Sequence, residues 1–201
     1  MKAEVLRNQL SQIPTFQGAK ERLLNREEYY LMAKAEILGP GEKVELLAGK
    51  IYTMSPVGSR HAMCVNRLTA LLIPLVGEKF LVSVQNPITL SEQSEPEPDL
   101  ALWKPPFEKY EQQLPDPAEV RLVIEVADSA LTKDRDLKLP LYAEAGIEEV
   151  WLVDLAKEQI EVYTQPSGNL YTLRRIIQRG GEVELLGESI TMERVFGEKR
   201  A

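Results

Sequence analysis

The segment VRLVIEVA at positions 120–127 constrains the fold more than any other, because it is an apolar run interrupted by one acid. Aliphatic residues stand at most of its positions, which is typical of a β-strand buried on both faces of a sheet. Glu125 lies within this run. An ionised carboxylate there is costly unless a cation, a metal ion or several hydrogen-bond donors meet it. The sequence therefore raises the question of which group meets Glu125.

A helical segment and a second apolar strand follow. The polar segment after Ala127 indicates a helix that Gly146 can end, and EEVWLVDL at 148–155 indicates a strand. Two strands joined by such a crossover are expected to be parallel. The remaining pattern predicts helices over 24–38 and 61–76, hairpins over 44–54 and 159–177, and strands over 80–90, 100–103 and 182–187. The predicted class is α/β, with a mixed sheet flanked by helices.

Length and composition fit one domain. For the 201 residues we expect an N-terminal helical arm over 1–22, a single domain over 23–197 and a tail over 198–201. The single Cys64 excludes a disulfide framework and favours a reducing, cytoplasmic location. No run has the apolar length of a membrane span or signal peptide, so no membrane association is expected. A net charge of −7 argues mildly against nucleic-acid binding, although a basic patch or bound metal would offset it.

Two acids are candidates for a metal site. Asp99 follows EPEP at the start of the strand over 100–103, and Glu125 lies in the apolar strand. If the two strands pair, the carboxylates converge, and a divalent cation between them relieves their repulsion. Oxygen ligands suit Mg²⁺ or Mn²⁺, which can activate water and neutralise phosphate charge. The alternative is that each acid caps a strand or pairs with a lysine; we favour the metal site for Glu125 and assign Asp154 to a turn.

Lys138 is the candidate cation. It shares one helical face with Asp134 and Tyr142, so it forms either an ordinary ion pair with Asp134 or a contact with the acids of the site. His61 opens a predicted helix and is either a packed core residue or a cleft-facing one. Glu45 starts a predicted strand and is either a further ligand or exposed. No phosphate-binding glycine loop or nucleophile elbow is present, which leaves metal-assisted hydrolysis as the chemistry with several candidate residues.

Four motifs together resemble the Uma-two family of putative restriction endonucleases, which is grouped with the PD-(D/E)XK nuclease superfamily. They are VELLAGKIYTMSPVGSRH, EPEPDLALW, LVIEVADSALTKDRDLKLPLYAEAGIEEVWLVDL and IEVYTQP. The resemblance runs from about LNREEYYLMA to ITMERVF, nearly the whole chain after the N-terminal arm. It implies a restriction-endonuclease-like core with a mixed sheet flanked by helices.

The resemblance also implies roles for the candidate residues. Asp99 of the Pro98-Asp99 element and Glu125 would be metal ligands. The superfamily lysine two residues after the second acid is absent, because Ala127 stands there. Lys138 would be a migrated catalytic lysine.

Three further residues match auxiliary positions of the family. Tyr142 accompanies Lys138 in KLPLY, at the spacing where related nucleases carry a glutamine and a tyrosine. Glu45 and His61 match an auxiliary acid and histidine near the metal.

These residues and the resemblance lead to one expected function and two alternatives. We expect an endonuclease that depends on Mg²⁺ or Mn²⁺, hydrolyses DNA phosphodiester bonds and forms a homodimer. One alternative is a catalytically silent nuclease-fold module for binding or interaction, favoured by Ala127. The other is a hydrolase of a smaller phosphate ester, which an acidic surface tolerates better.

Overall fold

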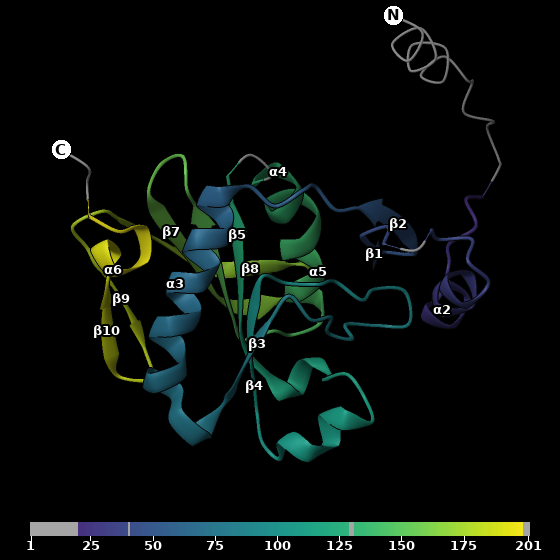
Figure 1. The fold of residues 1–201 in the computed structure, drawn as a ribbon, viewed down its shortest axis with the longest axis horizontal. Coiled ribbons are helices and arrows are strands. Elements are labelled where there is room, and N and C mark those ends of the chain that lie inside the picture. The colour runs from purple at the N-terminus through teal and green to yellow at the C-terminus, as the bar shows by residue number, and fades with distance from the viewer. Residues whose placement is uncertain (1–19, 40, 129–130, 199–201) are drawn as a thin grey trace, which may run out of the picture.

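A six-stranded mixed sheet forms the centre of the protein (Figure 1). The computed structural model describes residues 20–39, 41–128 and 131–198. Strand β5 (Val120–Ala127) pairs antiparallel with β4 (Leu100–Trp103) and parallel with β6 (Glu149–Asp154). The α/β class and the parallel pair predicted from the sequence are confirmed. The described residues do not include residues 1–19 of the predicted arm over 1–22. They also do not include residues 199–201 of the predicted tail.

The remaining elements surround these strands. The sheet order is β3-β4-β5-β6-β7-β8, with β3 (Leu81–Val84), β7 (Gln159–Ser167) and β8 (Leu170–Gln178). Two separate hairpins are β1 (Val44–Leu47) with β2 (Lys50–Thr53) and β9 (Glu182–Leu185) with β10 (Glu188–Thr191). The α-helices are α2 (Arg26–Lys34), α3 (Ser59–Val76), α4 (Leu131–Lys133), α5 (Leu139–Glu144) and α6 (Met192–Phe196). Short 3₁₀ turns cover Gly77–Lys79, Phe107–Glu111 and Pro117–Glu119.

One strand is shorter than predicted from the sequence, and two elements were not predicted. The strand expected over 80–90 ends at Val84, because Gln85 has a φ of 52° and Pro87 follows, so the ladder cannot continue. Strand β10 and helix α6 were not predicted, since both are short and weakly periodic.

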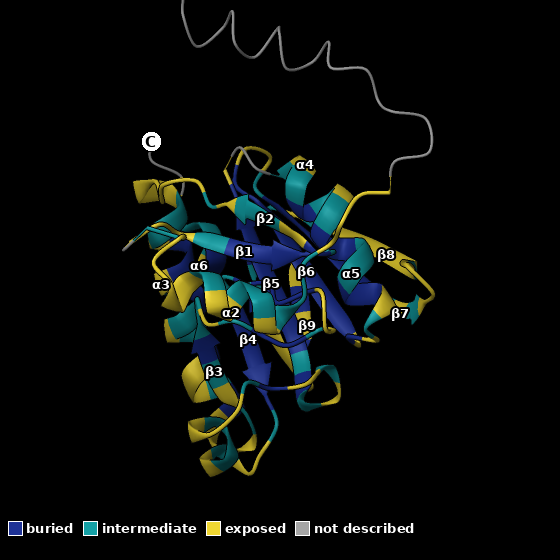
Figure 2. Ribbon diagram, turned by 90° about the vertical axis from the view of Figure 1, so that its right-hand side faces the viewer, coloured by how far each residue is buried: buried dark blue, intermediate teal, exposed yellow. Residues whose placement is uncertain are grey.

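Helix α3 covers one face of the sheet together with α6. The predicted apolar stripe is confirmed at Val65, Leu68 and Leu72, which are buried against the sheet, whereas Leu75 is only partly buried. Pro74 lies in the last turn, and the helix ends two residues later. Helix α5 covers the opposite face, where a second core cluster forms. Figure 2 shows the buried strands in dark blue between these layers.

Helix α2 and the β1–β2 hairpin lie beside the sheet, and hydrogen bonds tie them to the segment before β4. The predicted capping box is present, with Asn25 and Glu28 each bonding the other's backbone. The backbone N–H of Glu95 donates to the carbonyl of Leu46 at 2.8 Å. This contact fixes the hairpin, and with it Glu45, next to the chain segment that leads to Asp99.

The proline-rich segment 104–119 follows β4 and therefore lies at the end of that strand opposite Asp99, as Figure 1 shows. Among the described residues, no helix combines the length and apolar character that crossing a bilayer requires.

Glu161 on β7 is a fully buried carboxylate that forms ion pairs with two arginines. Arg135 approaches one oxygen at 2.6 Å and Arg174 the other at 3.0 Å, while the Tyr163 hydroxyl donates at 2.6 Å. Burial alone would raise the pKa of Glu161, but the hydrogen bonds from Tyr163 and Arg174 and the Arg135 charge bring it below the usual value. A lowered pKa stabilises the fold above the unfolded pKa of about 4.3, and that contribution disappears as pH falls through the folded pKa.

Glu161→Gln should therefore reduce the free energy of unfolding by about 1–3 kcal/mol at pH 7, because both arginines lose their buried partner. The stability of the variant should also fall less steeply than that of the wild type between pH 5 and pH 3, a range set by about one unit on either side of the unfolded pKa. Urea denaturation at pH 7 and at steps between pH 5 and pH 3 measures both effects. Parallel pH profiles would contradict the assignment of the lowered pKa.

Candidate active site

The register of the central strands brings Asp99 beside Glu125. Leu100 pairs with Ile124, so Asp99, one residue before β4, comes alongside the middle of β5. The backbone N–H of Val126 donates to Asp99 Oδ2 at 2.8 Å, which fixes the carboxylate at the strand end. The pairing of the two strands, on which the predicted convergence depended, is therefore present.

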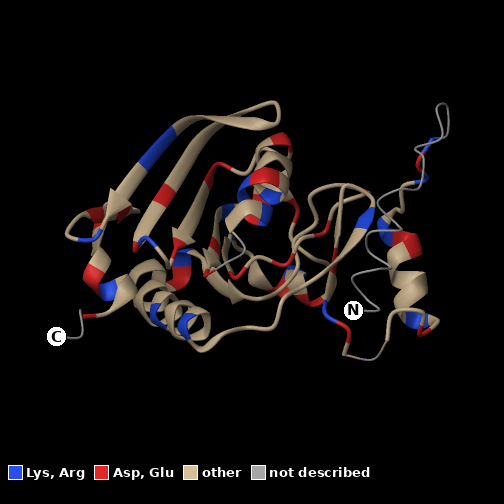
Figure 3. Cartoon of the chain, turned by 90° about the horizontal axis from the view of Figure 1, so that it is seen from above, with Lys and Arg blue, Asp and Glu red and all other residues tan. Residues whose placement is uncertain are grey.

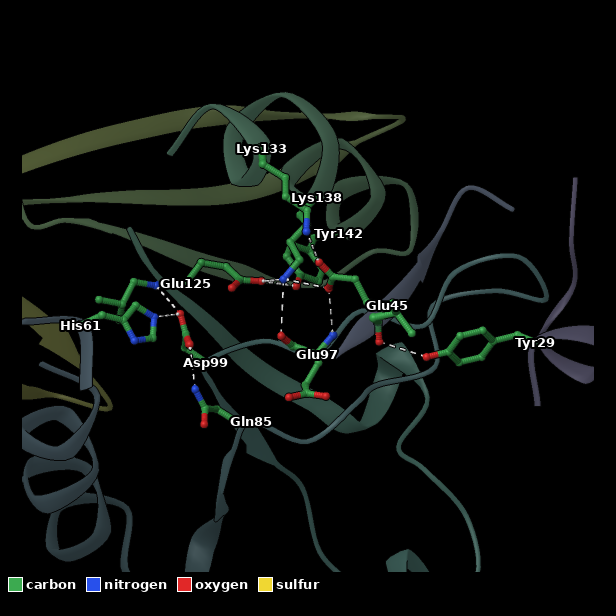
Figure 4. Close-up of polar contacts among 12 residues, drawn as sticks. Tyr29, Glu45, His61, Gln85, Glu97, Asp99, Glu125, Lys133, Lys138 and Tyr142 are labelled. Atoms are coloured by element: carbon green, nitrogen blue, oxygen red, sulfur yellow. Dashed lines mark hydrogen bonds and ion pairs between the residues drawn. The ribbon is translucent and has the colours of Figure 1, made fainter. Parts of the chain in front are cut away.

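Lys138 is the group that meets Glu125. Its Nζ lies 2.9 Å from Glu125 Oε1, and the Tyr142 hydroxyl donates to the same oxygen at 2.5 Å (Figure 4). Lys138 Nζ also lies 3.1 Å from Glu45 Oε2. All three of these partners are buried. The ordinary ion pair between Lys138 and Asp134 is not formed; the lysine reaches the acids instead.

A π-helical turn over Asp134–Lys138 orients the side chain of this lysine toward the acids of the site. The N–H of Leu139 donates to the carbonyl of Asp134, five residues back. Pro140 has no N–H, and in a regular α-helix its ring would clash with the carbonyl of Asp136. The wider turn avoids this clash and buries Asp134 and Lys138 together.

Glu45 and His61 hold this arrangement from two other elements. Glu45 on β1 is buried and accepts from Lys133 Nζ at 2.6 Å as well as pairing with Lys138. His61 in the first turn of α3 contacts Asp99 through Nε2 at 3.0 Å. The hydrogen bond to Asp99 raises the pKa of His61, although burial opposes this. The structure thus places both predicted auxiliary residues at the site.

Burial dominates the electrostatics of the cluster. It raises the pKa of Glu125, against the opposing effect of the Lys138 ammonium. Burial would lower the pKa of Lys138, but Glu125, Glu45 and Asp134 together raise it above the usual value, so the lysine carries its charge at neutral pH. Burial likewise raises the pKa of Asp134 to about 6, again opposed by Lys138.

These side chains line one cavity of about 250 Å³. Six carboxylates and three lysines face it, so its lining is acidic. The acids are Glu45, Glu97, Asp99, Glu125, Asp128 and Asp134, and the lysines are Lys43, Lys133 and Lys138. Figure 3, seen from the α4 end, shows acidic positions in red on segments near the centre, with basic positions in blue beside them. A cavity of this charge favours a cation over a free anion.

A divalent cation fits the donors available here. Both bonds to Glu125 use Oε1, so Oε2 has no hydrogen-bond donor among the described residues, and Asp99 lies alongside. Within the described ranges, no three His, Cys, Asp or Glu side chains are already grouped around a metal position. The fit is therefore to two protein carboxylates with water completing the shell, which is how Mg²⁺ is commonly held.

Lys133 and Asp134 belong to the site but were not predicted as site residues. Lys133 contacts Glu45, and its ammonium lies 5.8 Å from the centre of the Tyr52 ring. The sequence signal for Asp134 was its position on the same helical face as Lys138, for which a local ion pair was one of two alternatives. Asp154 bonds the backbone N–H groups of Ala156 and Lys157, in agreement with its assignment to a turn.

The fold and this site define a class of protein with a restriction-endonuclease-like α/β core. The sequence matches the Uma2 family, described as "Putative restriction endonuclease", over residues 26–194. The chain therefore belongs to the Uma2 family, whose description makes it a family of nucleases.

A solved structure has the same fold. It is a crystal structure of "a putative nuclease belonging to DUF820" from Anabaena variabilis ATCC 29413, with a TM-score of 0.67 and 13% sequence identity. The match covers 86% of this chain and 97% of that one. A comparison with curated proteins found no significant match.

Lys138→Met should lower the free energy of unfolding by about 3–5 kcal/mol at pH 8, because Glu125 and Glu45 then stay buried without their shared cation. Urea denaturation measures the change. Lys157→Met is a suitable control, because that lysine side chain is 65% exposed, and it should change stability by less than about 0.5 kcal/mol. Equal losses in both variants would contradict the importance of the buried pair.

Proposed function

We propose that the protein is a metal-dependent endonuclease that hydrolyses phosphodiester bonds in DNA. The observation that carries the proposal is the contact of the Lys138 ammonium with Glu125, beside Asp99 at the end of the paired strands. This contact places a lysine ammonium beside the second acid, although Ala127 occupies the position of the superfamily lysine. Membership of the Uma2 family supports the same reaction class.

Asp99 and Glu125 are the residues that would hold the cation, Mg²⁺ or Mn²⁺. A cation bound by two carboxylates lowers the pKa of water and neutralises charge on a phosphate. The hydrogen bond from the Val126 N–H keeps Asp99 in place for this role. His61 Nε2 contacts the same oxygen, Oδ2, so the two contacts together orient the Asp99 carboxylate.

The remaining residues supply and position positive charge. Lys138 directs its ammonium toward the cavity, where it can stabilise the charge that develops on the phosphate. Tyr142 fixes the Glu125 carboxylate by donating to Oε1. Glu45 holds Lys138 and Lys133 together, so both cations are positioned before substrate binds.

The partners and location proposed from the sequence are DNA, a second copy of the chain and the cytoplasm. Edge strand β8 exposes Leu170, Leu173 and Ile176, and a second copy could cover these side chains. The buried, reduced Cys64 is compatible with the cytoplasm. The small acidic cavity also supports an alternative function, the hydrolysis of a smaller phosphate ester.

Ile176→Lys should convert a homodimer into a monomer, because an exposed apolar side chain on β8 becomes charged. Light scattering coupled to size-exclusion chromatography measures the mass. Leu31→Lys is the matched control, since Leu31 is also exposed but lies on α2. A wild-type protein that is monomeric at all concentrations would refute the dimer.

Plasmid DNA with Mg²⁺ or Mn²⁺ tests the nuclease proposal. The wild type should nick or linearise the plasmid, and EDTA should stop it. Asp99→Asn and Lys138→Gln should each lower the rate by roughly 100-fold or more, because each removes a group that acts on the reacting phosphate. Circular dichroism confirms that the variants are folded.

The control for this experiment is Asp136→Asn, an exposed acid on the same π-helical turn as Lys138. It should cleave like the wild type. Equal cleavage by all four proteins would indicate a contaminating nuclease and refute the assignment. Cleavage of a small phosphodiester such as bis-p-nitrophenyl phosphate, but not of DNA, would favour the alternative substrate.

A further inference from the structure

Asp134 is a buried carboxylate with no assigned partner. Its exposed fraction is 8%, and it makes no hydrogen bond or ion pair with any described residue. The lysines nearest to it in the chain, Lys133 and Lys138, are both engaged by Glu45 instead. A buried, unpaired carboxylate is costly to the fold, so its presence calls for a ligand.

The position of Asp134 identifies the kind of ligand. Its side chain lines the same cavity as Asp99 and Glu125 and comes from the π-helical turn rather than from the sheet. Two other acids of the cavity are paired: Asp128 with Arg60, and Glu45 with the two lysines. The Glu97 carboxylate also has no partner among the described side chains, but it is only half-buried. Asp134 is therefore a buried, unpaired acid in the cavity where Asp99 and Glu125 would hold a cation.

We propose that Asp134 is a positioning residue for this cation and accepts hydrogen bonds from the water of its hydration shell. This inference rests on the proposed metal site and adds a third carboxylate to it. Direct ligation is not required, since no three acids are grouped around one point in the described part of the chain. Mg²⁺ and similar ions keep several of their waters when protein carboxylates bind them, and these waters need acceptors.

The proposal predicts opposite effects of one substitution on metal affinity and on stability. Asp134→Asn keeps the shape of the side chain but removes the charge that a hydrated cation requires. It should weaken Mn²⁺ binding roughly 10- to 100-fold, as loss of a residue behind the direct ligands typically does. In EDTA at pH 8 it should raise the Tm by roughly 2–4 °C, because an unpaired buried charge is gone.

Isothermal titration calorimetry with Mn²⁺ alone, on the full chain, tests the affinity, and differential scanning calorimetry in EDTA tests the Tm. The matched control is Asp136→Asn, which removes an exposed acid two residues along the same turn and should change neither quantity. Asp99→Asn should abolish Mn²⁺ binding and thereby reports on the underlying metal site.

The outcomes separate this inference from the proposed function. If the wild type binds Mn²⁺, Asp99→Asn does not, and Asp134→Asn binds like the wild type, the metal site stands and the role of Asp134 is refuted. A lower Tm for Asp134→Asn in EDTA would also refute it, since the residue would then be a structural one. Absence of Mn²⁺ binding by the wild type would refute the metal site and this inference with it.

Discussion

The buried pair of Glu125 and Lys138 is the interaction on which the rest of the site depends. Taking two charges out of water costs several kcal/mol for each, and only close contact with additional hydrogen bonds offsets that cost. Tyr142 and Glu45 supply the additional contacts. The crossover between β5 and β6 must therefore return the lysine to the strand it has just left, and Pro140 with the π-helical turn is the local solution.

The residues of the site come from different parts of the fold. Asp99 and Glu125 come from adjacent strands of the sheet, Lys138 from the crossover, and Glu45 and His61 from elements outside the sheet. The acids are placed by strand register, which is rigid, whereas the lysine is placed by side-chain contacts. The position of the Lys138 ammonium thus depends on the side chains that contact it. The positions of the carboxylates depend on them less, because strand register places the acids.

Much of this arrangement could be predicted from the sequence, and the exceptions have physical causes. The acid within VRLVIEVA identified Glu125, and helical spacing correctly put Lys138 and Tyr142 on one face. Sequence spacing could not reveal which acids contact Lys138, because Glu45 lies far away in the chain and only tertiary packing brings it close. For the same reason spacing left two alternatives for Lys138, an ion pair with Asp134 or a contact with the acids of the site, and the structure shows the second.

The position of Glu45 on a separate hairpin has a consequence for motion. Strands β1 and β2 form a separate sheet, so Glu45 reaches the two lysines from an element outside the six-stranded sheet. Because Glu45 binds Lys133 and Lys138 at once, a displacement of the hairpin would release the Lys133 ammonium, while Lys138 would keep its contact with Glu125. The placement of the hairpin is thereby coupled to the positive charge available in the cavity, chiefly through Lys133.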